Sequence, residues 1–256
     1  MSNERYNVIR LEQVDSTNNY GKTIARDGAV DRTVVVAERQ TAGRGRLGRK
    51  FESDGSGLYM SIILRPHLDM AQVNKLTLVA AVAVRKALFM SCGLEGFIKW
   101  PNDIVADGKK ICGILTEMSA VNTTVNFVVV GIGININDDS FPEELSDKAA
   151  SVKMMTGKQC DKDEIMYSVL REFEGYYNSF EKNGDLSDMM DEYSRFLINK
   201  GEKVRIVNGD DSFEGVCMGV DSGGELLVKR QLADNTEEIV TVISGDVSVR
   251  GVYGYV

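Results

Sequence analysis

Histidine and clustered cysteine are almost missing from this sequence of 256 residues. It holds one histidine, His67, and four cysteines that stand singly at Cys92, Cys112, Cys160 and Cys217. A structural zinc site needs several such ligands at short spacings, usually with a Cys-x-x-Cys pair. The sequence therefore argues against zinc, and its scattered cysteines fit a reduced compartment better than a disulfide framework.

Long apolar runs and a secretory leader are also missing. No stretch of about 20 residues is apolar and free of charge, which predicts no membrane-spanning helix. The first residues, MSNERYNVIRLEQ, are polar and charged, unlike the apolar segment of a secretory signal. We therefore expect a cytoplasmic protein with no membrane partner.

Proline is scarce, and acidic charge outweighs basic charge. Three prolines and the lack of low-complexity tracts argue against a disordered chain, and 43% hydrophobic residues can build a core. Acidic residues number 38 against 30 basic ones, for a net charge of −8. Because nucleic-acid binding depends on cations that neutralise phosphates, this balance predicts no general affinity for DNA or RNA.

The residue pattern predicts an α+β domain followed by a small β domain. We expect strands at residues 6–14, 33–40, 57–65, within 96–118 on both sides of a break at Pro101, and at 124–136. We expect helices just after Asp15 and at residues 70–93, 162–180 and 186–198. Residues 201–251 alternate in short strands with Asn-Gly, Gly-Asp and Gly-Gly turns, which is typical of a small β-barrel. The predicted domains are residues 1–199 and 200–256.

A positively charged, glycine-rich loop contrasts with the acidic balance of the chain. It follows the predicted strand at 33–40 and reads TAGRGRLGR. Glycines let a backbone approach a ligand closely, and Arg44, Arg46 and Arg49 offer forked donors to a carboxylate or phosphate. A solvated basic turn is the alternative. The loop lacks the Gly-Lys-Ser/Thr of a P-loop, and no helix follows it as in a dinucleotide-binding fingerprint.

Two further motifs place polar side chains at strand ends. In KWPNDI, Pro101 breaks the strand and leaves Asn102 and Asp103 able to bind a polar ligand edge or Mg²⁺, although such a segment is often a simple turn. In GKKICGIL, alternation points either Lys109 or Lys110 inward, where an anion must balance its charge. Both lysines could instead lie on an exposed strand edge.

The last motif, GIGININ, ends the predicted strand at 124–136. Its glycines and asparagines could clamp a flat base or sugar, or form only a tight strand exit. The order of the motifs is more informative than any one of them. DSTN, ERQTAGRGRLGR, KWPNDI, KKICGIL and GIGINI follow one another at spacings that closely resemble the biotin protein ligases. The resemblance covers residues 6–137 and continues weakly through the C-terminal region.

The resemblance implies both a fold and a reaction. The fold is a mixed sheet packed with helices, like the catalytic domain of class II aminoacyl-tRNA synthetases, followed by an SH3-like β-barrel. The reaction converts biotin and Mg·ATP into biotinyl-5′-AMP and then transfers biotin to a lysine of a biotin carboxyl carrier protein, such as that of acetyl-CoA carboxylase. Two anions meet in the first step, so positive groups must offset their repulsion.

The same resemblance implies the site residues. Those implied for biotin are Ser16, Thr17, Asn18, Gln40, Gly43, Arg44, Gly45, Arg46, Lys110 and Gly113. Those implied for ATP and the adenylate are Arg44, Arg46, Arg49, Phe51, Asn102, Lys110, Gly133 and Asn135. The implied catalytic residues are Lys110, Arg46 and Asp103, of which Asp103 is also the implied Mg²⁺ ligand. The glycine-rich loop would close over biotin as a mobile lid.

Other functions and assemblies stay open. A lipoate or octanoate ligase on the same fold, or a non-enzymatic binding protein, would share some of these motifs. Some members of the family carry an N-terminal DNA-binding domain, whereas this sequence starts at the first strand of the catalytic region, so we expect no specific DNA binding. Relatives dimerise by pairing sheet edges, and GLYMSIIL is a candidate edge strand for a homodimer.

Overall fold

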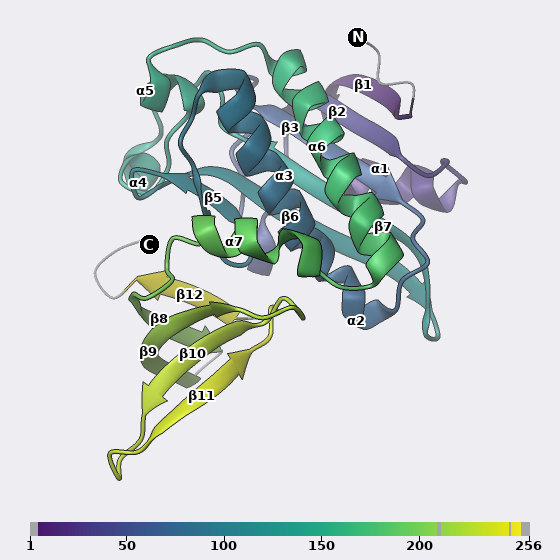
Figure 1. Cartoon of the computed structure of the whole chain (residues 1–256). Coiled ribbons are helices and arrows are strands. Elements are labelled where there is room, and N and C mark those ends of the chain that lie inside the picture. Colours follow the sequence, from purple (N-terminus) through teal and green to yellow (C-terminus); the bar gives the residue numbers. More distant parts are fainter. Residues whose placement is uncertain (1–4, 209–210, 246, 252–256) are drawn as a thin grey trace.

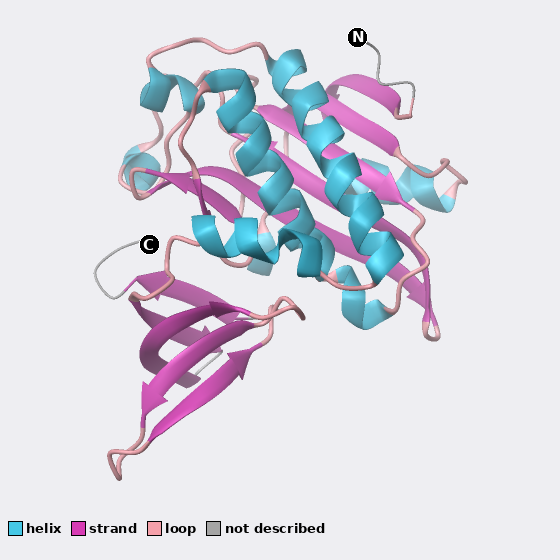
Figure 2. Ribbon diagram, in the orientation of Figure 1, coloured by secondary structure: helices cyan, strands magenta, loops and turns pink. Residues whose placement is uncertain are grey.

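The chain forms two β-sheets, and helices pack around the first of them. The structure, a computed structural model, describes residues 5–208, 211–245 and 247–251. The first sheet has the strand order β1-β2-β3-β7-β6-β5-β4 and the second has the order β11-β10-β9-β8-β12. Figure 1 shows the chain leaving the first unit through α7 (Met190–Phe196) before it enters the second sheet. Figure 2 shows that the second sheet carries no helix of its own.

The first sheet is mixed. Its strands are β1 (Asn7–Val14), β2 (Thr33–Gln40), β3 (Leu58–Leu64), β4 (Phe97–Lys99), β5 (Asp103–Ala106), β6 (Lys109–Val121) and β7 (Thr124–Ile134). The β1–β2 pair is parallel and the other pairs are antiparallel. These strands confirm the predicted mixed sheet.

The helices are α1 (Thr17–Arg26), α2 (Met70–Val73), α3 (Lys75–Cys92), α4 (Glu143–Ser146), α5 (Val152–Thr156), α6 (Lys162–Asn183) and α7, with single 3-10 turns η1 (Arg46–Gly48) and η2 (Ser187–Met189). The helix expected at 70–93 is divided, because Asn74 separates α2 from α3. Gly93 ends α3 in the left-handed conformation, as its sequence position indicates. The short helices α4 and α5 were not expected, since they span only four and five residues.

The two faces of the first sheet are covered unequally. α3 and α6 pack side by side across one face, and α1 lies on the other (Figure 1). Side chains alternate along a strand, so Met60 and Ile62 of β3 point into the large core under α3 while Ile63 points toward α1. A stretch of the α1 face therefore stays open to form a site.

One assembly expectation is wrong. GLYMSIIL forms β3, which lies between β2 and β7 rather than at a sheet edge. All seven residues of β3 are buried, because neighbours cover both of its sides and both of its faces. Among the described strands, the edges of this sheet are β1 and β4, so β3 cannot pair with a second copy.

The second sheet is antiparallel and open where it is described. Its strands are β8 (Lys203–Asn208), β9 (Asp211–Val220), β10 (Leu226–Gln231), β11 (Glu237–Val242) and β12 (Val247–Gly251). β11 and β12 are its two edges among the described residues, so the sheet does not close into the predicted barrel. The Gly-Asp turn expected at residues 209–210 lies outside the described residues. The domain boundary at residue 199 stays a prediction.

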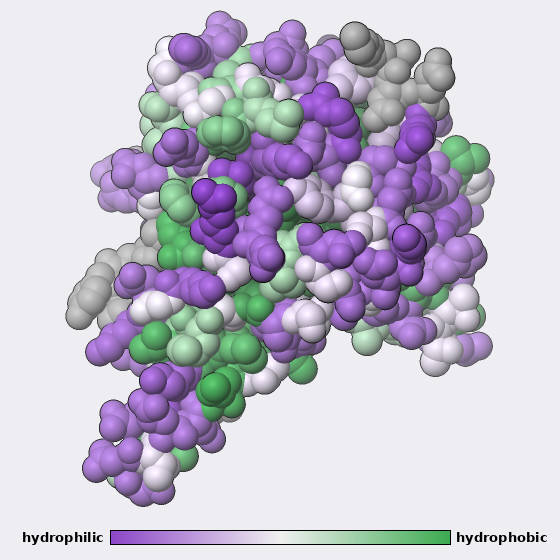
Figure 3. Space-filling model, viewed as in Figure 1, coloured by the Kyte–Doolittle hydropathy of each residue, from purple (hydrophilic) through white to green (hydrophobic). Residues whose placement is uncertain are grey.

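Polar and apolar contacts join the two units. The Trp100 indole N–H donates to the Gly224 carbonyl at 3.0 Å, and a Cβ on Gly224 would lie 3.3 Å from the side chains of Leu78 and Leu186. Figure 3 shows hydrophobic side chains gathered on the second sheet next to α7, whereas its far tip is hydrophilic. Trp100 is therefore a buried junction residue, at 2% exposure. None of the helices in the described ranges combines the length and the apolar character that crossing a membrane requires.

Candidate functional site

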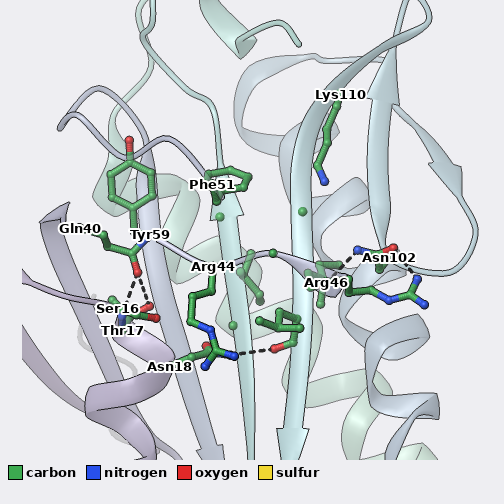
Figure 4. Close-up of a pocket in the computed structure, with 17 residues that line it drawn as sticks. Ser16, Thr17, Asn18, Gln40, Arg44, Arg46, Phe51, Tyr59, Asn102 and Lys110 are labelled. Atoms are coloured by element: carbon green, nitrogen blue, oxygen red, sulfur yellow. Dashed lines mark hydrogen bonds between the residues drawn. The ribbon is translucent and has the colours of Figure 1, made fainter. Parts of the chain in front are cut away.

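A pocket opens on the α1 face of the first sheet, beneath the glycine-rich loop (Figure 4). It is lined by Ser16, Thr17, Asn18, Gln40, Arg44, Gly45, Arg46, Phe51, Tyr59, Asn102, Lys110, Gly113, Ile114, Leu115, Gly131, Ile132 and Gly133. Hydroxyl and amide groups gather at one end of it, with Arg44 beside them, and Arg46 and Lys110 lie at the other end. This arrangement suits a ligand with a neutral polar head and an anionic tail.

The strand register builds the floor of the pocket. Gly133 lies opposite both Tyr59 on β3 and Gly113 on β6. Two glycines in this row remove side chains from the middle of the sheet. A Cβ on Gly133 would lie 2.8 Å from the Phe51 ring, so the ring rests directly on the backbone.

The next row places polar groups beside the start of α1. Gly131 lies opposite Ser61 on β3 and Leu115 on β6. A Cβ on Gly131 would lie 2.0 Å from Asn18 Oδ1, so only glycine admits the Asn18 amide here. The amide donates to the Leu115 carbonyl at 3.1 Å, and its oxygen accepts from the Ser61 hydroxyl at 2.6 Å.

The first turn of α1 is joined to the end of β2. Thr17 donates to Gln40 Oε1 through its backbone N–H at 2.8 Å and its hydroxyl at 3.1 Å. The Gln40 amide nitrogen donates to the Ser53 hydroxyl at 2.8 Å, which ties the same group to the glycine-rich loop. These bonds fix a cluster of donors and acceptors at the neutral end of the pocket.

Glu117 is a charged anchor behind this cluster. It accepts hydrogen bonds from Lys22 at 2.7 Å and Asn18 at 2.9 Å, and lies 3.4 Å from Arg44. Burial acts to raise the pKa of Glu117, but the hydrogen bonds from Lys22 and Asn18 outweigh it and hold that pKa below its ordinary value. The carboxylate therefore stays ionised and orients Arg44.

The glycine-rich loop folds back on itself as a short hairpin. Gly45 N donates to the Arg49 carbonyl at 2.7 Å, and Phe51 N donates to the Gly43 carbonyl at 2.9 Å. A Cβ on Gly43 would lie 2.3 Å from the Phe51 carbonyl oxygen, so this turn requires glycine. The hairpin carries the Phe51 ring over the pocket floor.

Phe51 occupies the middle of the pocket. Its ring meets Tyr59 edge to face, with centroids 6.3 Å apart and planes at 74°, and lies on the floor glycines (Figure 4). The remaining cavity is about 40 Å³, room for a few waters. Ligand pockets usually measure about 300 Å³ or more, so the loop and its phenylalanine must shift to admit a substrate.

A β-bulge aims Lys110 at the site. Ile104 pairs with Cys112 but Val105 pairs with Lys110, so β6 has an extra residue, Ile111, at this point. The bulge reverses the alternation, so Lys110 points to the same face of the sheet as Gly113. The Lys110 ammonium lies 2.8 Å from the position that a Cβ on Gly113 would take. Lys109 points away and donates to the Ser146 carbonyl at 2.9 Å.

Cations collect beside Lys110 around one carboxylate. Lys110 Nζ lies 2.7 Å from Asp103 Oδ1. Lys99 is buried, at 6% exposure, and its pKa falls to about 8. Burial is the main cause, Asp103 acts against it, and the cations Lys110, Arg49 and Arg250 add to it. A site with several cations around one carboxylate is suited to a ligand with more than one negative charge.

Arg46 bridges the site and the second sheet. One of its nitrogens donates to Asn102 Oδ1 at 3.0 Å, and the other donates to the Gly245 carbonyl at 2.5 Å. Asn102 is held in turn, since its amide donates to the Ile114 carbonyl at 3.1 Å. The KWPND turn therefore holds the Arg46 guanidinium in place through Asn102.

Most of the residues implied by the resemblance come together in this pocket, and four do not line it. Gly43 supports the hairpin, Asp103 pairs with Lys110, and Arg49 lies among the cations near Lys99. The Asn135 amide is turned into the protein, where it donates to the Ala150 carbonyl at 3.1 Å. In this structure Asn135 therefore braces the segment beside Lys110 and does not face the cavity.

Besides the apolar lining residues Ile114, Leu115 and Ile132, four contributors were missed. Tyr59 and Ser61 are the polar residues in GLYMSIIL, and their spacing of two could have indicated one polar face. Gly131 belongs to GIGININ, whose first glycine received no role. Glu117 had no distinguishing pattern, because one acidic residue in a strand is ordinary. In the described ranges, no group of three or more His, Cys, Asp or Glu side chains is placed to hold a metal ion.

Comparisons with known proteins agree with this geometry. The model of the biotin/lipoate A/B protein ligase family matches residues 11–135. A bifunctional ligase/repressor BirA of Bacillus spizizenii is 37% identical over 247 residues, which make up 94% of this chain and 74% of that protein. A biotin–[acetyl-CoA-carboxylase] ligase of Paracoccus denitrificans is 30% identical over 224 residues, 86% of this chain and 92% of that protein.

A solved structure is similar over nearly the whole chain. The biotin protein ligase from Aquifex aeolicus in complex with biotin and ATP superposes with a TM-score of 0.82 at 32% identity, and the match covers 96% of this chain and 99% of that one. The likeness therefore runs through both sheets.

Proposed function

The chain belongs to the biotin protein ligase family, and on that premise we propose how its pocket activates biotin with ATP and passes it to a carrier protein. The observation that carries the proposal is one pocket with fixed polar groups and Arg44 at one end and Arg46 and Lys110 at the other. A neutral ureido ring and a carboxylate, the two ends of biotin, match these two environments.

The neutral end of the pocket binds the ureido ring. Ser16, Thr17, Asn18 and Gln40 supply the donors and acceptors. Bonds to Ser61 and Glu117 already fix Thr17 and Asn18, and bonds to Thr17 and Ser53 fix Gln40. A ring with two N–H groups and one C=O needs such partners, because each group left unpaired on burial costs about 1–3 kcal/mol. Lipoate has no ureido group, so this end favours biotin over it.

The cationic end of the pocket brings two anions together. The biotin carboxylate attacks the α-phosphorus of ATP, an acyl–phosphate bond forms, and pyrophosphate leaves. Lys110 lies where its ammonium can contact both the carboxylate and the α-phosphate, and the 2.7 Å ion pair with Asp103 holds it in place. Arg46 adds forked donors to the same charge, which grows on the phosphoryl oxygens in the transition state, whereas Arg44 lies beside Asn19 and Glu117 at the ureido end.

Mg²⁺ enters with the nucleotide as part of the substrate. Asp103 offers one carboxylate, but Lys110 already pairs with it. Mg²⁺ bound with nucleotides commonly takes one or two carboxylates, phosphate oxygens and waters. We assign most of its ligands here to the triphosphate and to water, with Asp103 as the nearest protein carboxylate.

The glycine-rich loop opens and closes over this chemistry. Phe51 covers Gly133 in the present conformation and must leave before a ligand can lie on the floor glycines. Closure of the loop afterwards excludes water, which would otherwise hydrolyse the mixed anhydride. In the second step a carrier lysine attacks the acyl carbon, an amide bond forms, and AMP leaves.

The second sheet supports the lid from outside. Its Gly245 carbonyl holds Arg46, and its Gly224 carbonyl holds Trp100 of the KWPND turn. We propose that this unit, residues 200–256, is an SH3-like domain that steadies the KWPND turn and the lid while the carrier protein docks.

Pyrophosphate exchange tests the proposal. The protein is incubated with Mg·ATP, labelled pyrophosphate and either biotin, lipoate or octanoate, and label incorporation into ATP is measured. Exchange with biotin alone is expected. Exchange with lipoate or octanoate instead would identify a lipoate or octanoate ligase on the same fold. Exchange with none of the acids would indicate a binding protein that does not form an adenylate.

A further inference from the structure

Two cysteines outside the pocket lie against each other. Cys92 is the last residue of α3, and Cys160 lies just before α6 (Lys162–Asn183). Figure 1 shows the end of α3 beside the start of α6. The two thiols are within hydrogen-bonding reach, both are half-buried, and both are free. The mechanism above uses neither of them.

The folded chain holds Cys160 in this position. Its backbone N–H donates to Asn137 Oδ1 at 3.0 Å, and its carbonyl accepts from Asn137 Nδ2 at 2.9 Å. Asn137 N donates in turn to the Ser56 carbonyl at 3.1 Å. On the other side, Gly93 fixes the end of α3 in a left-handed turn. The approach of the two sulfurs is thus set by secondary structure and by paired amide bonds.

A second cavity borders the pair at Cys92. It measures about 430 Å³ and is lined by Cys92, Glu95, Asp107, Met155 and Lys158 among others. A small thiol reagent can enter a space of this size. In the part of the chain that the structure describes, no third His, Cys, Asp or Glu completes a metal site with these cysteines, which favours redox chemistry over metal binding.

We propose that Cys92 and Cys160 form a reversible disulfide when the protein meets a disulfide oxidant such as oxidised glutathione. The Cys160 thiolate attacks one glutathione sulfur, an S–S bond forms, and one glutathione thiolate leaves. Cys92 loses its proton to solvent and attacks the Cys160 sulfur, and the second glutathione thiolate leaves. The two protein thiols are oxidised, and one glutathione disulfide is reduced to two thiols.

The order of the two attacks follows from the environments of the thiols. Burial, and then the hydrogen bond with Cys160, raise the pKa of Cys92 to about 12, so it is a poor first nucleophile near neutral pH. It reacts second, when Cys160 already carries the leaving group and the attack is intramolecular. The first mixed disulfide should therefore form at Cys160.

The bond would restrain one half of the active site. The closed loop, residues 92–160, contains β4 to β7, and with them Lys110, Gly113, Gly131 and Gly133. Cross-links across long loops stabilise mainly by constraining the unfolded chain. An increase of about 5–10 °C in the melting temperature is expected for the oxidised protein.

Mass spectrometry of the full-length chain tests the proposal. The wild type and the variants Cys92→Ser, Cys160→Ser and Cys217→Ala are equilibrated in glutathione buffers of increasing oxidised fraction, quenched with acid and alkylated. Cys112 and Cys217 are fully buried, so they should stay reduced. Wild type and Cys217→Ala should lose two thiols as one cross-link between the peptides that contain Cys92 and Cys160, with the rise in melting temperature. Cys92→Ser should stop at a glutathione adduct on Cys160.

Two results would overturn the proposal. The first is that both thiols remain free in the folded wild type even in fully oxidised glutathione. The second is that each cysteine carries its own glutathione and no cross-linked peptide is found. Peptide mapping of the wild type decides between these outcomes even if one of the serine variants fails to fold.

Discussion

The two faces of the first sheet are built from the same strands and serve different ends. Toward α3 and α6, residues such as Met60, Ile62 and Val130 are fully buried and contribute only packing. Toward α1, the adjacent positions carry Ser61, Gly131 and other small or polar residues that form the pocket. Alternation along a strand allows one sheet to combine a stable core with a ligand site.

The difference shows that one face of the sheet provides stability and the other provides function. A glycine in a strand interior weakens the sheet, and a buried polar group must find partners. The pocket face has both features, and the aliphatic face with its two helices offsets them. Substitutions on the pocket face should therefore change catalysis first, and substitutions on the helix face should change stability first.

The largest expected effect comes from Lys110→Gln on the pocket face. Loss of its charge at the reacting phosphate should lower biotin-dependent pyrophosphate exchange about 10²–10³-fold, the usual effect of removing one preorganised charge-stabilising group. Lys109→Gln is the matched control, because that side chain points to Ser146 and should change exchange little. Equal losses in both variants would show that the bulge at Ile111 does not separate the two lysines.

Limited proteolysis compares the pocket face with a distant region. Cleavage within residues 43–55 requires the lid to open, so biotin at about 100 times its Kd should slow it by up to about 100-fold. The turn at residues 232–236 in the second sheet is the internal control and should be cut at an unchanged rate. Equal cleavage of the lid with and without saturating biotin would contradict closure over the ligand.

Gly131→Ala tests the close approach of Asn18. The new Cβ would lie 2.0 Å from the Asn18 oxygen and must displace that side chain from its bonds to Ser61 and Glu117. The loss of about 1–3 kcal/mol of hydrogen bonding should raise the KM for biotin about 10–100-fold with a smaller effect on the KM for ATP. An unchanged KM for biotin would remove Asn18 from the ureido site.

Sequence reasoning reached the strands and the long helices, because these depend on local patterns, and the family resemblance brought in most of the pocket residues. β2 occupies the predicted residues 33–40, and Gly93 ends α3 where expected. The neighbours of each strand depend on the whole sheet. β3 was therefore misjudged as an edge, although its unbroken burial on both faces is typical of a central strand.

The site was predicted less completely than the fold. The bulge at Ile111 reverses the face of Lys110, and nothing in KKICGIL marks an extra residue. The motif predicted that Asn135 would be available for a ligand, but its amide donates to the Ala150 carbonyl. Ala150 lies in a segment whose sequence shows no strong pattern. Both differences come from contacts between separate segments, and the residue spacing within one motif cannot predict such contacts.

Conservative core substitutions sharpen the comparison on the helix face. Ile62→Val removes one methyl group from the core under α3 and should lower the free energy of unfolding by about 0.5–1.5 kcal/mol. Ile63→Val makes the same change on the side toward α1, in a smaller cluster. Denaturant unfolding measures both, and the KM for biotin should stay within about 2-fold of wild type in each. A large change in KM for Ile62→Val would show that the two faces are coupled.

The smallest expected effect concerns Lys99, which brings a charge into a buried position beside Lys110. Its pKa is about 8 in the folded protein against 10.5 ordinarily, so between these values the unfolded chain binds more protons. Stability must therefore rise with pH across that window. Lys99→Met should flatten this rise in unfolding experiments between about pH 8 and pH 9.5, below the range in which tyrosines ionise, while Lys158→Met at an exposed position keeps it. An unaltered slope in Lys99→Met would mean that Lys99 keeps its ordinary pKa, and the pocket face would then hold its cations without a cost in stability.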